Sequence, residues 1–242
     1  MRGSAKGSAR IGARSGARDR SSAAPELPLA DQLAALTSDA ATLGLTLSEA
    51  TLEGLVAYLA LLRKWNAAYN LTAVRETIPM RSQHLADCLT VVAPLRRQIG
   101  PAATPRLLDV GSGGGLPGVV LALVEPAWQI TCVDTVGKKA AFIRQVAGEL
   151  GLRNLHAVHA RVEELPGPPF DVVTSRAFAS LPDFVRLTRP LLAPGGVWMA
   201  MKGRRPEDEM HALPGDIDLF HVEPLVVPGL DAERCLIWMR PR

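Results

Sequence analysis

The second half of the chain alternates short apolar runs with segments of helical pattern, and this alternation restricts the possible folds more than any other feature. Apolar runs of this length, each followed by a helix, are typical of a parallel sheet covered on both faces. The expected strands are 106–110, 128–134, 154–159, 170–175 and 196–201, and the expected helices are 118–124, 138–150 and 182–192. Two last apolar runs, 221–227 and 235–240, should close one edge of the sheet. Residues 101–242 are therefore predicted to form an α/β domain.

Residues 25–100 have a helical pattern instead, which predicts a cap of two to four helices before the sheet. In the clearest segment the apolar residues recur every three or four positions, at Leu52, Leu55, Val56, Leu59 and Leu62. Thr46 followed by Glu49 predicts a capping box at its start. A second helix is expected from about Pro79 to Gly100, with Leu85, Cys88, Leu89 and Val92 on one side.

The first 24 residues are mostly Gly, Ser, Ala and Arg, so they cannot bury enough apolar surface to offset the entropy of ordering. We expect a disordered tail, with a transit peptide, a weak RNA-binding arm or an upstream start as alternatives.

The tail also accounts for the positive net charge of the chain. Residues 1–20 carry six Arg or Lys against one Asp, so of the net charge of +3 they supply +5 and leave −2 elsewhere. An RNA surface on the body must then be a local patch.

The cysteines and the apolar runs favour a cytoplasmic protein without metal. Cys88, Cys132 and Cys235 are odd in number and form no CxxC pair, which fits reduced thiols better than disulfides or zinc. His84 shares a helix face with Cys88, but no further ligand pair accompanies them. The longest apolar run, 115–124, has about half of the roughly 20 residues that a membrane span needs. A monomer is the simplest expectation for the oligomeric state.

The segment DVGSGGGLPG (109–118) follows an expected strand and leads into an expected helix. Its glycines, among them Gly111 and Gly113, allow a tight turn and a close approach of the backbone to a ligand. The segment therefore reads as a loop of the nucleotide-binding type. Because GxGxxG can also be read from Gly113 to Gly118, a nicotinamide-dependent oxidoreductase is an alternative.

Asp134 ends the next expected strand, 23 residues beyond Gly111. A carboxylate at this place can accept both hydroxyls of an adenosine ribose. The same contact serves NAD and S-adenosylmethionine, so Asp134 indicates an adenosine ligand without naming it. The alternative is a surface turn residue.

With these residues in view, the chain from about Leu61 to Arg240 resembles the ribosomal RNA small-subunit methyltransferase G family, also called glucose-inhibited division protein B. The resemblance rests on seven ordered motifs: KWNAAYNLT (64–72), HLADC (84–88), DVGSGGGLPG (109–118), VDTVGKKAAFIRQV (133–146), RVEELP (161–166), SRAFASL (175–181) and MKGRRPEDE (201–209). Two departures are the basic tail and a Cys in HLADC where Ser is commoner. The resemblance implies a Rossmann-like class I S-adenosylmethionine-dependent methyltransferase fold, with helices on both faces of the sheet and an N-terminal helical cap.

The resemblance also implies a set of cofactor residues. They are Gly111 and Leu116 in the glycine loop, Val162 and Glu163 after a strand, and Arg176 in SRAF. Residues 154–159 read as a strand, so Val162 and Glu163 fall just past its carboxyl end, where open α/β sheets bind ligands. A backbone N–H there could meet adenine N1. The alternative for Glu163 is a solvated charge at a helix start.

Arg176 follows another expected strand and could bind the cofactor carboxylate or an RNA phosphate. Its alternative is a surface ion pair with Glu163 or Glu164. Five further basic residues could form a phosphate-contacting patch, although a solvated charged face is as good an interpretation for most of them: Lys139, Arg144, Lys202, Arg204 and Arg205. Trp65 and Tyr69 could stack a base, but their helical spacing favours a core role, and Asn70 reads as a helix cap.

The implied reaction is methyl transfer to N7 of a guanosine in 16S ribosomal RNA, with the free RNA or the small ribosomal subunit as partner. N7 carries no proton, so we assign no catalytic acid or base. The target guanosine must be unpaired or pulled from its stack. A non-catalytic RNA-binding assembly protein is the rival from another class.

Overall fold

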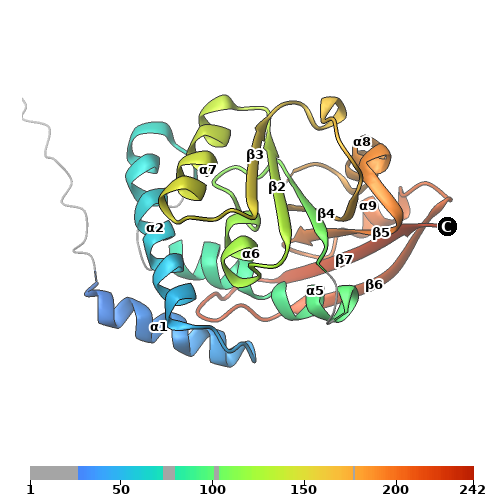
Figure 1. Cartoon of the computed structure of the whole chain (residues 1–242). Helices are drawn as coiled ribbons and strands as arrows, with labels where there is room; N and C mark the ends of the chain where they lie inside the picture. The colour runs from blue at the N-terminus through green and yellow to red at the C-terminus, as the bar shows by residue number, and fades with distance from the viewer. Residues whose placement is uncertain (1–26, 73–79, 101–103, 177) are drawn as a thin grey trace, which may run out of the picture.

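The computed structural model describes residues 27–72, 80–100, 104–176 and 178–242, and within them the strands form one seven-stranded sheet with the order β3-β2-β1-β4-β5-β7-β6 (Figure 1). The strands are β1 (Arg106–Val110), β2 (Gln129–Asp134), β3 (Leu155–His159), β4 (Phe170–Arg176), β5 (Leu192–Lys202), β6 (Ile217–Leu225) and β7 (Arg234–Pro241). The first five pair in parallel, and β7 pairs antiparallel with β5 and β6. The predicted α/β fold is confirmed, and so is the closure of one edge by the last two apolar runs.

Helices cover both faces because neighbouring residues of each central strand point to opposite sides. In β1, Leu107 belongs to the apolar cluster beneath α6 (Gly118–Val124) and α7 (Gly137–Glu149). The next residue, Leu108, belongs to the cluster beneath α8 (Leu181–Thr188). Both leucines are fully buried, which is why these strands read as continuous apolar runs.

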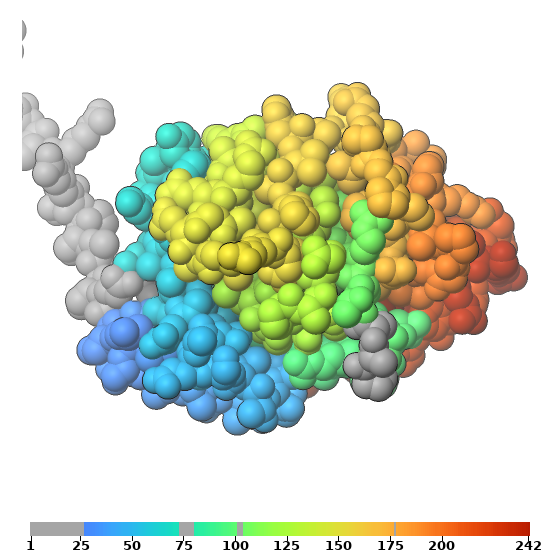
Figure 2. All heavy atoms as spheres, in the orientation of Figure 1, coloured from blue at the N-terminus to red at the C-terminus, as the bar shows by residue number. Residues whose placement is uncertain are grey.

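The cap consists of α1 (Leu29–Thr42), α2 (Glu49–Tyr69), the π-helical turn η1 (Arg81–Ala86), α4 (Asp87–Leu89) and α5 (Val92–Ile99). Its apolar residues lie in the same buried cluster as those of α6 and α7. Figure 1 shows α2 beside α7, and in Figure 2 the cap (blue to cyan) lies directly against residues 118–150 (yellow-green). The cap and the sheet therefore share one core.

The predicted stripe of α2 is buried, but the predicted capping box is wrong. The helix begins at Glu49, and the hydroxyl of Ser48 accepts a hydrogen bond from the backbone N–H of Thr51 at 3.1 Å. Thr46 lies two residues earlier and is exposed. A serine at this position satisfies one of the free N–H groups of the first turn, so no reciprocal Glu49 contact is needed.

The second cap helix is not continuous as predicted, although Leu85, Cys88, Leu89 and Val92 are all buried. The chain leaves the helix at Thr90 and Val91 and resumes in α5. Pro94 explains the interruption, because its ring would collide with the carbonyl of residue 90 in an unbroken helix. The predicted start at Pro79 and the predicted tail 1–24 lie outside the described residues.

Two other boundaries differ from the prediction. Helix α8 ends at Thr188 rather than near 192, and a 3₁₀ turn containing Pro190 follows. Strand β5 already begins at Leu192, and β6 spans Ile217–Leu225 rather than 221–227. Within the described parts of the chain, we find no helix long and apolar enough to cross a membrane.

The parallel register sets the place of the site. Val110 is paired with Val133 of β2 and with Ser175 of β4, so these strands end at the same edge of the sheet. The glycine loop, Asp134 and Arg176 therefore meet there, as expected for the ligand-binding edge of an open α/β sheet.

Candidate functional site

The glycine loop after β1 passes close to other parts of the protein, and this explains two of its glycines. Gly111 has a φ of +66°, and a Cβ on it would lie 2.8 Å from the ring of Phe178. A Cβ on Gly114 would lie 2.9 Å from the side chain of Leu62 in α2. Side chains at these positions would force the loop away from its neighbours.

Three hydrogen bonds between the backbone of the loop and side chains of β1, β2 and α2 help to fix the loop. Asp134 accepts one from the N–H of Gly113 at 2.9 Å, and Asp109 accepts one from the N–H of Gly118 at 2.9 Å. From the cap, the hydroxyl of Tyr58 donates to the carbonyl of Gly114 at 2.6 Å. The loop is therefore held in its middle, at Gly113 and Gly114, and at Gly118, where α6 begins.

Asp109 is fully buried beneath the loop, and burial raises the pKa of its carboxyl to about 7. The hydrogen bond from Gly118 and the charge of Arg176 oppose this effect. One oxygen accepts the Gly118 bond, and the other, Oδ1, has no hydrogen-bond partner among the described residues. A large fraction of the carboxyl is thus protonated near neutral pH.

Asp134 is 5% exposed, and each of its oxygens accepts one backbone N–H, Oδ2 from Gly113 and Oδ1 from Val136. The ammonium group of Lys139 lies 3.6 Å from Oδ2. A carboxylate oxygen can accept more than one hydrogen bond, so both retain acceptor capacity for further donors.

Two cavities open at this edge of the sheet and share Gly111. The smaller, about 230 Å³, is lined by Asp134, Val162, Lys139, Phe178 and the ends of β1 and β2. The larger, about 530 Å³, extends between the glycine loop, the cap and the ends of β4, β5 and β7. Its lining includes Leu71, Thr72, His84, Asp87, Gly113, Leu116, Arg176, Met201, Lys202 and Arg234.

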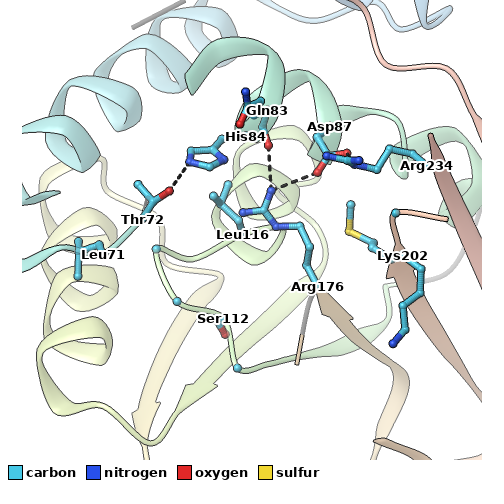
Figure 3. A pocket seen from close by; sticks show the side chains of 15 residues that line it. Leu71, Thr72, Gln83, His84, Asp87, Ser112, Leu116, Arg176, Lys202 and Arg234 are labelled. Carbon is cyan, nitrogen blue, oxygen red and sulfur yellow. Dashed lines mark hydrogen bonds and ion pairs between the residues drawn. The ribbon is translucent and has the colours of Figure 1, made fainter. Parts of the chain in front are cut away.

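Asp87 of the cap joins two arginines in the wall of the larger cavity (Figure 3). Its Oδ2 lies 3.1 Å from Nη1 of Arg176, and its Oδ1 lies 3.0 Å from Nε of Arg234. Nη1 of Arg176 also donates to the carbonyl of Gln83 at 3.0 Å. The aspartate is 2% exposed, so the cluster fastens the cap to the ends of β4 and β7.

His84 lies in the same wall, with Nε2 2.8 Å from the hydroxyl of Thr72. Burial and the charge of Arg176 lower its pKa to about 4, so the imidazole is neutral at physiological pH. Lys202 extends away from the Asp87 cluster (Figure 3). It donates to Glu209 at 2.8 Å and to the carbonyl of Ala179 at 3.0 Å. The charge of Lys202 is therefore largely balanced.

The structure brings most of the predicted site residues together. Gly111, Gly113, Leu116, Arg176 and Lys202 line the larger cavity, whereas Asp134 and Val162 line the smaller one with Gly111.

Two predicted residues lie elsewhere. Glu163 is exposed in a short 3₁₀ turn, Val162–Glu164, and lines neither cavity. Arg144 is exposed on α7 and donates to the carbonyl of Ala157 in β3, while β2, β1 and β4 separate that strand from β5 and Lys202. Arg144 and Lys202 therefore do not form one patch.

The contacts of Arg176 and Trp65 and the backbone conformation of Asn70 can be compared with the predictions for these residues. Arg176 is paired with Asp87, not with Glu163 or Glu164. Trp65 packs 5.4 Å from the ring of Phe142 at the core, and Asn70 ends α2 in a left-handed conformation. No cluster of three or more metal-ligating side chains occurs among the described residues.

Three residues of the site, Asp87, Arg234 and Tyr58, were not predicted from the sequence. A signal existed for Asp87, because an acidic residue directly precedes the apolar pair Cys88 and Leu89 of a buried helix. Buried charged residues are rare unless they are paired. Nothing in the sequence pattern indicated its partners.

The sheet order, the glycine loop after β1 and the acidic residue ending β2 define the class I S-adenosylmethionine-dependent methyltransferase fold. Solved structures agree at the level of the fold. TrmN from Thermus thermophilus matches with a TM-score of 0.51 and 20% identity over 66% of this chain and 53% of that one. The glycopeptide N-methyltransferase MtfA, in complex with S-adenosylmethionine, matches with a TM-score of 0.51 and 12% identity over 62% of this chain and 92% of that one.

The family follows from sequence similarity over most of the chain. Residues 51–237 match the family model for rRNA small subunit methyltransferase G. Ribosomal RNA small subunit methyltransferase G of Leptothrix cholodnii is 62% identical over 207 residues, which cover 86% of this chain and 94% of that protein. The protein of the same name from Acidovorax sp. (strain JS42) is 60% identical over 214 residues, with the same coverage. The chain belongs to the rRNA small subunit methyltransferase G family.

Proposed function

We propose that this protein transfers the methyl group of S-adenosylmethionine to N7 of a guanosine in 16S ribosomal RNA. The observation that carries the proposal is the family match over residues 51–237, which includes the glycine loop and both cavities. Family membership also favours methyl transfer over nicotinamide-dependent oxidation or reduction and over a non-catalytic assembly role. Binding of S-adenosylmethionine but not of NAD would separate these functions directly.

The two cavities fit the two ends of the cofactor. The smaller one offers the carboxylate of Asp134 for the ribose hydroxyls and the apolar side chain of Val162 beside the adenine. The larger one continues past Gly111 and Leu116 and has room for the methionine part and for a base. When bound, S-adenosylmethionine supplies an electrophilic methyl group. Glu163, being exposed, has at most a backbone role in this arrangement.

The residues around the larger cavity are suited to position a base rather than to move a proton. Guanine N7 has a lone pair and no proton, so methylation requires alignment and no general base. His84 is neutral and bonded to Thr72, and the apolar Leu71, Leu116 and Met201 exclude water around the reacting atoms. A base must leave its stack to reach this depth.

RNA contacts are assigned to the basic residues at the cavity and beside it. Arg176 and Lys202 line the cavity and can meet phosphates flanking the target base. Arg144 is exposed on α7 and can contact only a more distant part of the RNA. Each such contact strengthens binding in a salt-dependent way. A cytoplasmic monomer acting on free RNA or on the small subunit is the expected setting.

The experiment that tests the acceptor atom uses RNA with 7-deazaguanosine at the target position. This change replaces the lone-pair nitrogen by C–H and leaves the Watson–Crick edge and the stacking surface in place. The modified RNA should bind with nearly the affinity of the normal RNA and accept no methyl group. Methyl incorporation into the modified RNA would mean that another atom accepts the group and that N7 is wrong.

A further inference from the structure

The cluster of Asp87, Arg176 and Arg234 is more than a structural ion pair, because it leaves cationic groups facing the larger cavity. One buried carboxylate serves two guanidinium groups, so the cluster has a net charge of +1. Asp87 is 2% exposed, while the side chains of Arg176 and Arg234 retain 24% and 26% of their surface. All three side chains line the cavity, but the two arginines are far more exposed than Asp87, so this part of the wall is positively charged.

The hydrogen bonds show which part of each guanidinium group is occupied. Arg176 uses Nη1 for Asp87 and for the carbonyl of Gln83. Arg234 uses Nε for Asp87 and Nη1 for the carbonyl of Glu233. Among the described residues, no partner is found for Nη2 of either arginine. The two N–H groups of Nη2 on each arginine are therefore among those that remain to bind an acceptor.

The remaining charged groups of the cavity do not supply that acceptor. Lys202 is paired with Glu209, and His84 is neutral because burial lowers its pKa to about 4. Asp87 is the only carboxylate among the described residues that line the cavity. Neither guanidinium group is among the buried polar atoms without a partner, so water can reach both free edges. An oxyanion can replace this water with charge-assisted hydrogen bonds to both edges.

We propose that Arg176 and Arg234 together bind one oxyanion in the larger cavity and that Asp87 is the residue that positions them. The inference deepens the proposed function and rests on it. The oxyanion is either a phosphate of the RNA beside the target base or the carboxylate of the cofactor. A phosphate and a carboxylate each present two oxygens that can accept hydrogen bonds from the Nη2 groups of the two arginines. Asp87 orients these arginines by binding Nη1 of Arg176 and Nε of Arg234.

The decisive variant is Asp87→Asn, because it separates positioning from simple charge. It removes a negative charge next to the cavity, so a site that acts only by charge would bind an oxyanion more tightly. An asparagine replaces one of the two carboxylate oxygens by an NH2 group, which cannot accept a hydrogen bond from a guanidinium group, so one arginine loses its partner. If Asp87 positions them, affinity should instead fall about tenfold, and Arg234→Lys, which keeps the charge, should lose a similar amount.

A matched control removes another ion pair of the cap. Asp39 is 7% exposed and pairs with Arg81 at 2.6 Å, away from both cavities. Asp39→Asn should lower the melting temperature about as much as Asp87→Asn and leave ligand affinities within a factor of two. All variants are measured at a temperature where each is folded.

Two binding measurements distinguish the sources of the oxyanion. If it is the cofactor carboxylate, Asp87→Asn and Arg234→Lys weaken S-adenosylmethionine but not 5′-methylthioadenosine, which lacks the amino acid part. If it is an RNA phosphate, cofactor affinity is unchanged, the Kd for RNA rises at saturating cofactor, and the salt slope falls by about one.

The inference is overturned if folded Asp87→Asn protein binds both ligands as tightly as the wild type or more tightly. It is also overturned if Asp39→Asn weakens binding to the same extent, because the effect would then be general destabilisation. Failure of the proposed function would look different. Wild-type protein would then bind the cofactor without methylating ribosomal RNA, and the comparison with 5′-methylthioadenosine would still test the site.

Discussion

Asp109 is the residue whose protonation should set a measurable pH dependence of stability. Its pKa is raised to about 7 by burial, above the ordinary value of 3.8, so the folded state binds this proton more tightly than the unfolded state. The stabilisation is complete below about pH 4 and is lost as the pH rises through 7. The free energy of unfolding should therefore fall by about 2.5 kcal/mol between pH 5 and pH 8 from this group alone.

Urea unfolding of the wild type and of Asp109→Asn at these two pH values measures the effect. Asparagine resembles the protonated carboxyl in shape and keeps an oxygen for the N–H of Gly118, so the variant should lack this part of the slope. Equal pH dependence in both proteins would assign the slope to other groups.

Asp134 supports a second prediction, which concerns cofactor affinity. Asp134→Ala should weaken S-adenosylmethionine binding by about 1 to 3 kcal/mol, because the acceptor for the ribose hydroxyls is lost. The structure adds that Gly113 and Val136 lose a hydrogen-bond partner as well, so some thermal stability should also be lost. The variant should also bind S-adenosylhomocysteine more weakly, and by the same amount, because that ligand has the same ribose. Calorimetry showing unchanged affinity in a folded variant would remove Asp134 from the site.

Helix α2 holds the glycine loop through the buried hydrogen bond from Tyr58 to the carbonyl of Gly114. Tyr58→Phe leaves this carbonyl without that donor and should lower the free energy of unfolding by about 1 to 2 kcal/mol. Cofactor affinity should fall as well, because the loop lines both cavities. Denaturant unfolding and calorimetry measure the two effects.

Tyr69→Phe is the matched control for this helix. Tyr69 lies on α2 too, but its side chain is 45% exposed and lines neither cavity. Its replacement should change stability and affinity little. If the two variants behave alike, the cap does not fix the loop through Tyr58.

At the scale of the molecule, the basic segment at the N-terminus should contribute to RNA binding and not to stability. Deleting residues 1–24 should leave the melting temperature and the affinity for cofactor nearly unchanged, because the segment has almost no large apolar residues. RNA affinity should fall, most visibly at low salt, since six basic residues are removed.

A full-length variant in which the six basic residues of the tail are replaced by Ser separates the effect of the charge of the tail from the effect of its length. It should behave like the deletion in RNA binding at low salt and like the wild type in melting temperature. A large loss of thermal stability on deletion would show that the segment docks on the folded protein.

The sequence by itself determined the approximate strand positions, the glycine loop after β1 and the position of Asp134 at the end of β2, because these depend on local patterns. A strand buried on both faces requires a continuous apolar run, and a tight loop requires glycine at left-handed positions. The predicted positions of the first five strands differ from the observed ones mainly at their ends, most at β5. The errors in the helices came from Ser48, Pro94 and Pro190, whose local effects on the backbone outweigh the apolar pattern.

Only the tertiary structure decided which side chains meet at the site. Asp87 contacts Arg176 and Arg234, which lie 89 and 147 residues further along the chain. The exposure of Glu163 in the turn after β3 was also visible only in the structure, and the separation of Arg144 from Lys202 follows from the order of the strands. The spacing of apolar residues indicates which face of a helix or strand is buried, but not which distant helix or strand packs against that face. That choice depends on packing of the whole core, so the paired charges of the cavity could not be read from the sequence.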